Sequence, residues 1–135
     1  MITYLVDTNI LGYFARNSSA ALQTRMLAAL KDQEVAISAI TRAETRFGLA
    51  LLQPEDKRRR TIDLLLNELP VLPWTLEAAD QYGEIAAYLQ QTGQPIGETD
   101  TQIAAHALAL GLPLVTHNTR HFERVPGLKL EDWMA

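Results

Sequence analysis

Three carboxylates occupy positions where the sequence is otherwise apolar. Asp7 ends the apolar run of residues 2–6, while Glu44 and Asp100 each lie on the apolar stripe of a predicted helix. No Lys or Arg shares these stripes. Because an acid at the edge of a core normally has a partner, and hard divalent cations prefer oxygen ligands, we expect a metal ion between them. The three acids therefore predict a metal-dependent enzyme.

Each acid also has a simpler interpretation at the start of a helix. Thr41 and Glu44 have the spacing of a capping box, and for Glu44 alone we favour the cap over the ligand. Asp7 is followed by residues typical of an N-cap cluster, and Asp100 is placed to complement a helix dipole. Three independent coincidences are less expected than one site, so the site is the stronger hypothesis.

The elements that must position these acids alternate along the chain. Strands are predicted at residues 2–6, 34–38, 71–72 and 113–116, and helices at 9–15, 20–30, 40–52, 55–68, 76–91 and 101–110. This alternation predicts an α/β fold with a central parallel sheet and helices on both faces. Ligands of such sheets bind beyond the carboxyl ends of the strands, where Asp7 and Thr116 stand.

Helical spacing places two of the acids on inward faces. At 100° per residue, Asp100 projects along the line of the apolar residues Ile103, Ala104, Ala107 and Leu108. Glu44 falls in the same way among Ile40, Phe47, Gly48 and Leu51. His106 flanks the first stripe, and we interpret it as a packed, hydrogen-bonded residue rather than a ligand.

Composition limits the kind of protein that can carry this site. A chain of 135 residues suits a single domain, residues 1–135, and the absence of Cys excludes disulfides and thiolate metal sites. The first residues predict neither a signal peptide nor a membrane span, so a cytoplasmic protein is expected. A net charge of −4 disfavours a wholly basic nucleic-acid surface. Four arginines near the acids in sequence are candidates for phosphate contact, with a solvent-facing role as the alternative: Arg42, Arg46, Arg120 and Arg124.

Four segments in order resemble the motifs of one known family. These are residues 6–10 (VDTNI), 38–44 (SAITRAE) with Gly48, 96–107 (IGETDTQIAAHA) and 114–122 (LVTHNTRHF). The chain is similar to PIN-domain ribonucleases over almost its whole length, and most of all to the VapC toxins of bacterial toxin–antitoxin pairs. Any one of these motifs is weak evidence, whereas four at these intervals are strong.

The resemblance implies a three-layer α/β/α sandwich and an endoribonuclease that uses Mg²⁺ or Mn²⁺ and acts on structured RNA such as tRNA. It also implies a VapB-type antitoxin as partner, whose C-terminal segment occupies the active-site groove, and a homodimer without membrane contact. Asp7, Glu44 and Asp100 match the family's metal-binding acids. Four further positions match residues that support the site through hydrogen bonds: Thr8, Asn9, Ser38 and Thr116. The expected products of phosphodiester hydrolysis are a 5′-phosphate and a 3′-hydroxyl.

This chain departs from the family pattern at the position of the fourth acid, which we call the fourth corner of the site. Many relatives carry an acid where this chain has Asn118 or His121. Glu123 is a candidate substitute, Asn118 offers a carbonyl oxygen, and His121 suits Mn²⁺ or Zn²⁺ better than Mg²⁺. Three acids and water suffice for one Mg²⁺, since that ion often keeps several waters. The rival hypothesis is therefore a catalytically weak PIN domain that serves as an RNA- or protein-binding module.

Overall fold

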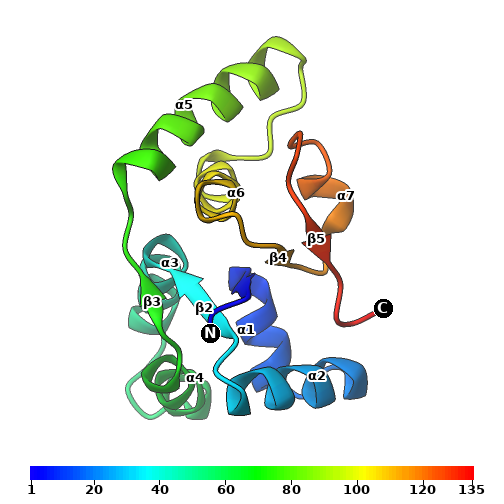
Figure 1. Ribbon diagram of the computed structural model, residues 1–135. Coiled ribbons are helices and arrows are strands. Elements are labelled where there is room, and N and C mark those ends of the chain that lie inside the picture. Colours follow the sequence, from blue (N-terminus) through cyan, green and yellow to red (C-terminus); the bar gives the residue numbers. More distant parts are fainter.

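The fold is a parallel sheet between two helical layers, as a computed structural model describes it for residues 1–135 (Figure 1). The strand order is β3-β2-β1-β4-β5, and every neighbouring pair is parallel. The strands are β1 (Tyr4–Val6), β2 (Val35–Ser38), β3 (Val71–Leu72), β4 (Leu114–Val115) and β5 (Leu130–Glu131). The helices are α1 (Thr8–Ala15), α2 (Ala20–Lys31), α3 (Ala39–Ala50), α4 (Lys57–Glu68), α5 (Leu76–Gln91), α6 (Glu98–Leu110) and α7 (Thr119–Phe122).

The predicted α/β/α architecture is confirmed, with two additions. All four predicted strands and all six predicted helices are present, with their ends displaced by up to three residues. The short helix α7 and the edge strand β5 were not predicted. Both follow β4, so the segment that returns the chain to the acidic edge is more structured than the sequence pattern indicates (Figure 1).

The core consists of two clusters, one on each face of the sheet. One cluster joins α1, α2 and α4 through residues such as Ile10, Met26 and Leu66. The other joins α5, α6 and α7 through residues such as Ile103 and Phe122. Because side chains alternate along a strand, neighbouring residues of β1 and β4 serve opposite clusters.

Helix α6, which carries Asp100, is delimited by two glycines. Gly97 precedes the helix with φ 92°, and Gly111 ends it in the left-handed conformation with φ 68°. Residues with a Cβ rarely adopt these values, so glycine at both positions fixes where the helix begins and ends. The helix start in turn places Asp100 in its first turn.

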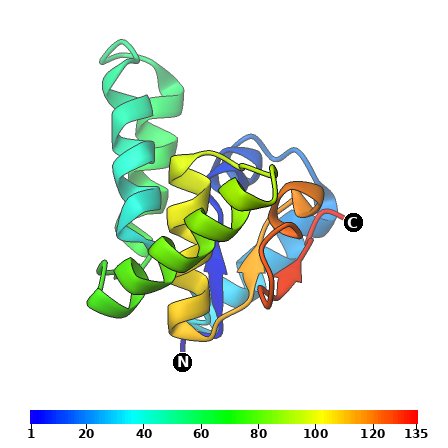
Figure 2. The same cartoon turned by 90° about the horizontal axis from the view of Figure 1, so that it is seen from above.

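Helices α3 and α4 pair into an arm that extends away from the rest of the molecule (Figure 2). The inward stripe predicted for residues 40–52 is therefore wrong beyond Glu44. Phe47 and Leu51 are 68% and 71% exposed, because this part of α3 has no layer over it. The stripe predicted for α6 is confirmed, since Ile103, Ala104 and Ala107 are fully buried. None of the seven helices has the length and hydrophobicity that crossing a membrane requires.

Candidate active site

Asp7 is the most buried acid of the molecule and joins β1 to α1. Its side chain is the N-cap of α1, where Oδ1 accepts the Thr8 N–H at 2.7 Å, so the predicted cap is confirmed. Its other oxygen, Oδ2, accepts the Thr116 hydroxyl at 2.9 Å from the end of β4. With only 3% of its surface exposed, this carboxylate is fixed by two donors and has no cationic partner.

Glu44 projects from the base of α3 toward Thr8, whose hydroxyl donates to Glu44 Oε1 at 2.6 Å. The Thr8 hydroxyl also lies 3.1 Å from that of the buried Thr41. Thr8 has a single hydroxyl proton and the carboxylate can only accept, so Thr41 is the donor to Thr8 in this chain of contacts. The predicted capping box of Thr41 and Glu44 is wrong, because the helix begins three residues earlier with Ser38 as its N-cap.

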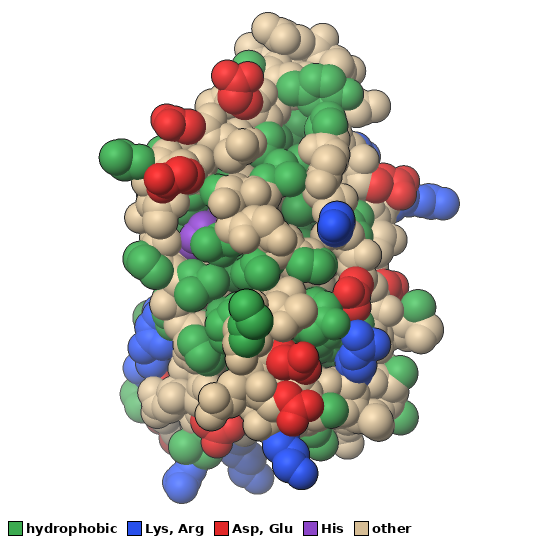
Figure 3. All heavy atoms as spheres, in the orientation of Figure 1, with side chains coloured by type: hydrophobic (Ala, Val, Ile, Leu, Met, Phe, Trp, Pro, Cys, Tyr) green, Lys and Arg blue, Asp and Glu red, His purple; other side chains and the backbone are tan.

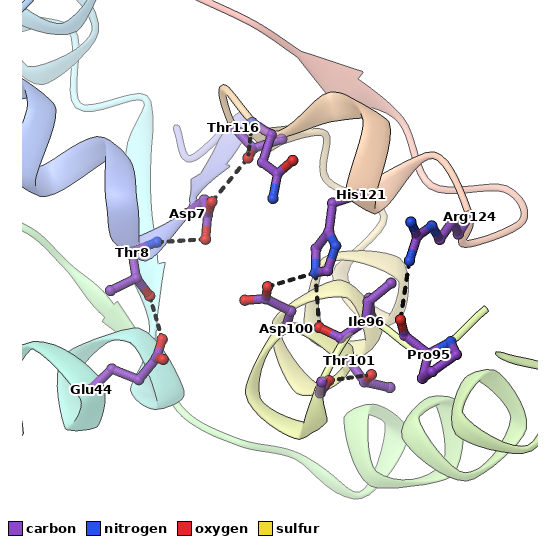
Figure 4. Close-up of polar contacts among 12 residues, drawn as sticks. Asp7, Thr8, Glu44, Pro95, Ile96, Asp100, Thr101, Thr116, His121 and Arg124 are labelled. Atoms are coloured by element: carbon purple, nitrogen blue, oxygen red, sulfur yellow. Dashed lines mark hydrogen bonds and ion pairs between the residues drawn. The ribbon is translucent and has the colours of Figure 1, made fainter. Parts of the chain in front are cut away.

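Asp100 lies in the first turn of α6, as predicted, and has a partner that the sequence did not reveal (Figure 4). His121 Nε2 is 2.9 Å from Asp100 Oδ2 and 2.8 Å from the carbonyl oxygen of Ile96. Both partners accept, so Nε2 carries a hydrogen shared between them. In this arrangement Nε2 has no lone pair for a metal ion, and His121 acts as a donor to Asp100.

Burial and neighbouring charge change the pKa of two of the three acids, Asp7 and Asp100. Burial raises the pKa of Asp7 from 3.8 to about 6, and the negative charges of Asp100 and Glu44 add to this rise. The hydrogen bonds from Thr116 and Thr8 oppose it. Burial also raises the pKa of Asp100, against the opposing effect of His121. Clustered carboxylates with raised pKa values are typical of functional sites and of sites that a cation would stabilise.

The donor set fits a hard divalent cation, although the side chains are not gathered into a complete coordination shell. Asp7 and Asp100 face the same space in Figure 4, whereas the Glu44 carboxylate is turned toward Thr8. No group of three or more acidic or histidine side chains is close enough to surround an ion as it stands. Because Mg²⁺ usually binds through one or two carboxylates and keeps several waters, Asp7 and Asp100 are the fitting direct ligands and Glu44 fits a water-mediated one.

The other residues predicted for the site divide into those that contact it and those that do not. Thr8 donates to both Asp7 and Glu44, and Thr116 donates to Asp7. Asn118 precedes α7 and donates its backbone N–H to Thr116 Oγ1 at 3.1 Å. Asn9 and Glu123 are exposed and contact none of the three acids. The expectation that Glu123 completes the acidic corner therefore has no support in the structure.

Ser38 supports the site through neighbouring residues and does not contact the three acids itself. Its hydroxyl oxygen accepts the Ile40 N–H at 3.0 Å and lies 2.7 Å from Nδ1 of His106, which is fully buried in α6. The interpretation of His106 as a packed, hydrogen-bonded residue is confirmed. This contact ties the start of α3, which carries Glu44, to α6, which carries Asp100.

The four candidate arginines have different surroundings. Arg46 is paired with Asp63 of α4, and Arg124 donates from Nη1 to the carbonyl oxygen of Pro95 at 3.1 Å. Arg42 and Arg120 make no ion pair or side-chain hydrogen bond, and Arg120 is exposed. In the face of Figure 3, Lys and Arg side chains lie mostly in the lower half, where Figure 1 places α2 and α4.

Thr116→Val is expected to raise the pKa of Asp7 above about 6, because the variant removes a hydrogen bond that favours the charged carboxylate. The loss of this bond is expected to cost about 2 kcal/mol of the free energy of unfolding at pH 8. A carboxyl-detected NMR titration and urea unfolding measure the two effects. Thr116→Ser keeps the hydroxyl and serves as the control, and an unchanged Asp7 pKa in the valine variant would contradict the assigned contact.

His106 is expected to make the folded protein acid-sensitive, because burial lowers its pKa below 6.5. Below pH 6.5 the unfolded chain therefore binds a proton at this residue more readily than the folded chain does. The free energy of unfolding is fully retained above pH 6.5 and falls as the pH drops below it. His106→Gln should lose less free energy of unfolding than wild type between pH 7.5 and pH 5, as measured by urea unfolding. His117→Gln is the surface control. Equal pH dependence in wild type and His106→Gln would refute this expectation.

The acids lie at the carboxyl edge of a parallel sheet, and the family model of the PIN domain matches residues 4–128, which include this sheet edge. The chain is 36% identical to the tRNA(fMet)-specific endonuclease VapC of Shigella flexneri, across 98% of this chain and 99% of the relative. It is 32% identical to ribonuclease VapC2 of Rickettsia felis, across 96% and 97%. It also matches DNA-bound VapBC from Salmonella typhimurium, with a TM-score of 0.89 and 32% identity across 98% and 99% of the two chains. The chain therefore belongs to the PIN-domain family and, within it, to the VapC ribonucleases.

Proposed function

We propose that this protein is the toxin of a toxin–antitoxin pair and that it hydrolyses structured RNA such as tRNA with the help of Mg²⁺ or Mn²⁺. The observation that carries the proposal is Asp7, a buried carboxylate with a pKa of about 6 beside two further acids and no Lys or Arg. The relatives named as ribonucleases support this activity rather than the alternative of a catalytically weak binding module. Its expected place of action is the cytoplasm.

The chain's own residues prepare the site for phosphodiester hydrolysis. When bound, a divalent ion supplies Lewis-acid stabilisation of phosphate charge and an activated water. Asp7 and Asp100 present oxygens toward that position, and Thr116 holds Asp7 in one orientation. The His121 contact holds Asp100 against the loop before α6 while leaving its second oxygen free of this bond. Glu44, anchored by Thr8, is the acid placed to orient water rather than to bind the ion directly.

We assign the antitoxin to the groove between α1, α3 and α4, whose lining includes none of the three acids, rather than to the active-site groove that the resemblance implied. This groove has a volume of about 480 Å³ and includes Gly12, Leu49 and Ile62 in its lining, with the exposed Phe47 and Leu51 on the same arm. Arg16, Lys57 and Arg58 also line it, so a partner segment with apolar and acidic residues fits its chemistry. The VapBC complexes among the structural relatives support a VapB-type partner. The homodimer stays a prediction.

The function is tested by incubating the purified, antitoxin-free protein with total tRNA in Mg²⁺, Mn²⁺ or EDTA. We expect cleavage with either metal ion, none in EDTA, and none by Asp100→Asn. Asp80→Asn, an exposed acid on α5, should cut like wild type and controls for the loss of one charge. Cleavage that persists in EDTA, or equal cleavage by Asp100→Asn and wild type, would refute the proposal.

A further inference from the structure

A second pocket lies beside the acidic site, on the other side of His121. It has a volume of about 550 Å³ and is formed by the end of α5, the loop before α6, and α7 with the turn after it. Its lining residues are Tyr88, Gln94, Arg120, Glu123, Arg124 and Pro126. This volume is within the range of sites that bind small ligands. Only one of the six, Pro126, is a plain apolar residue, so the pocket suits a polar ligand.

The pocket and the acidic site share one wall. The Ile96 carbonyl accepts from His121, which also contacts Asp100, while the adjacent Pro95 carbonyl accepts from Arg124 at 3.1 Å. Figure 4 shows Asp100 and Arg124 on opposite sides of His121, above the same short loop. A polymer bound at the acids therefore reaches the pocket by continuing past His121.

The chemistry of the pocket matches one nucleotide. Arg120 is exposed and has no ion pair, and Arg124 uses a single N–H for Pro95, so two guanidinium groups remain available against the one carboxylate of Glu123. Guanidinium groups recognise phosphate well. Tyr88 is 42% exposed and its hydroxyl makes no hydrogen bond. Gln94 adds an amide that can both donate and accept. Exposed aromatic rings stack on bases.

We propose that this pocket binds the nucleotide neighbouring the one that is cut, with its base on Tyr88 and its phosphate on Arg120. The placement on the cut strand rests on the proposed function, whereas nucleotide binding itself does not. Arg124 adds positive charge to the pocket, and its contact with Pro95 holds the loop before α6 in place. The pocket thus supplies strand positioning that the acids alone lack.

Nucleotide binding is tested by NMR on ¹⁵N-labelled protein in EDTA, titrated with AMP and, separately, with ribose 5-phosphate. We expect saturable shifts at the amides of Gln94, Arg120 and Glu123, with AMP binding about tenfold more tightly because only AMP has a base to stack. Tyr88→Ala should abolish this difference and Tyr88→Phe should keep it. Arg120→Ala should weaken both ligands, whereas Arg60→Ala, an exposed arginine on α4, should weaken neither.

Equal affinities for AMP and ribose 5-phosphate in wild type, or an unchanged preference in Tyr88→Ala, would overturn the proposal. A companion assay measures kcat/KM for tRNA cleavage, which should fall about tenfold in Tyr88→Ala and stay unchanged in Arg60→Ala. If wild type cuts RNA but AMP does not bind at Gln94 and Arg120, the proposed function is supported and the proposed nucleotide site is refuted. If AMP binds there but no RNA is cut with any metal ion, the pocket stands as a nucleotide site and the function fails.

Discussion

Asp7→Asn is expected to make the metal-free protein more stable at pH 8 while abolishing its RNA cleavage. The folded protein holds the pKa of Asp7 at about 6, against 3.8 for an ordinary aspartate, so it favours the neutral form. The stability that this preference contributes is fully present below pH 3.8 and is lost as the pH rises through about 6. At pH 8 the ionised carboxylate therefore costs up to about 3 kcal/mol, which an uncharged amide does not.

The net gain in the asparagine variant should be smaller than this limit. The amide has one accepting oxygen where the carboxylate has two, so either Thr8 or Thr116 loses its acceptor. We expect a gain of about 1 to 2 kcal/mol at pH 8 and almost none at pH 4, measured by urea unfolding in EDTA. Asp80→Asn on the surface of α5 should show no such pH-dependent gain.

Cleavage should respond in the opposite direction. Loss of a direct ligand removes several kcal/mol of transition-state stabilisation, which corresponds to a fall in kcat/KM of roughly 10³-fold. If neutralising Asp7 stabilises the protein but abolishes cleavage, the negative charge of Asp7 serves catalysis rather than folding. A variant that is less stable at pH 8 than wild type, or that still cuts RNA at the wild-type rate, would contradict this assignment.

His121→Glu is expected to exchange stability of the metal-free protein for metal affinity. The substitution removes the donor that lies 2.9 Å from Asp100 Oδ2 and 2.8 Å from the Ile96 carbonyl oxygen, and it introduces a second carboxylate beside Asp100. Loss of a hydrogen bond to a charged group and the new like-charge repulsion should lower the free energy of unfolding by about 2 kcal/mol at pH 8 in EDTA. Added acidic charge should tighten Mn²⁺ binding by roughly tenfold, since ligand charge sets the affinity of such sites.

The matched control is His121→Gln, whose side-chain amide can still donate to Asp100 and Ile96 but adds no charge. We expect its stability to lie close to wild type and its Mn²⁺ affinity to be unchanged. Urea unfolding in EDTA and isothermal titration with Mn²⁺ measure the two quantities separately. Equal metal affinity in the glutamate and glutamine variants would mean that the position of His121 is too far from the ion to serve as a fourth corner.

Two of the three acids could be located from the sequence because local patterns constrain them. Asp7 follows a strand directly, so the end of the apolar run marks the sheet edge. Asp100 shares a helix stripe with Ile103 and Ala107, and that stripe packs on the sheet. Glu44 was located by the same helical spacing, but the inward stripe on which that argument relied is largely exposed. Helical spacing does not reveal that α3 extends away from the rest of the molecule after its first turns.

The contacts that complete the site were beyond local patterns. His121 reaches Asp100 and the Ile96 carbonyl across 21 and 25 residues, because the loop before α6 lies against α7. Helix α7 has four residues and β5 has two, too few for an apolar period to appear. Thr41 was interpreted as a cap, although its burial against Thr8 depends on where α3 meets α1. Tertiary packing, rather than propensity, decides these positions.

Strand β1 has three residues, yet it sets the alignment of both halves of the molecule. Leu5 and Leu114 are paired across β1 and β4 and belong to the cluster of α5 and α6, whereas the next pair, Val6 and Val115, belongs to the cluster of α1 and α2. A slip of one residue would send each pair into the opposite cluster and draw Asp7 away from Thr116. The packing of both helical layers therefore selects the strand register that forms the active site, because only the register that buries both clusters also brings the acids together.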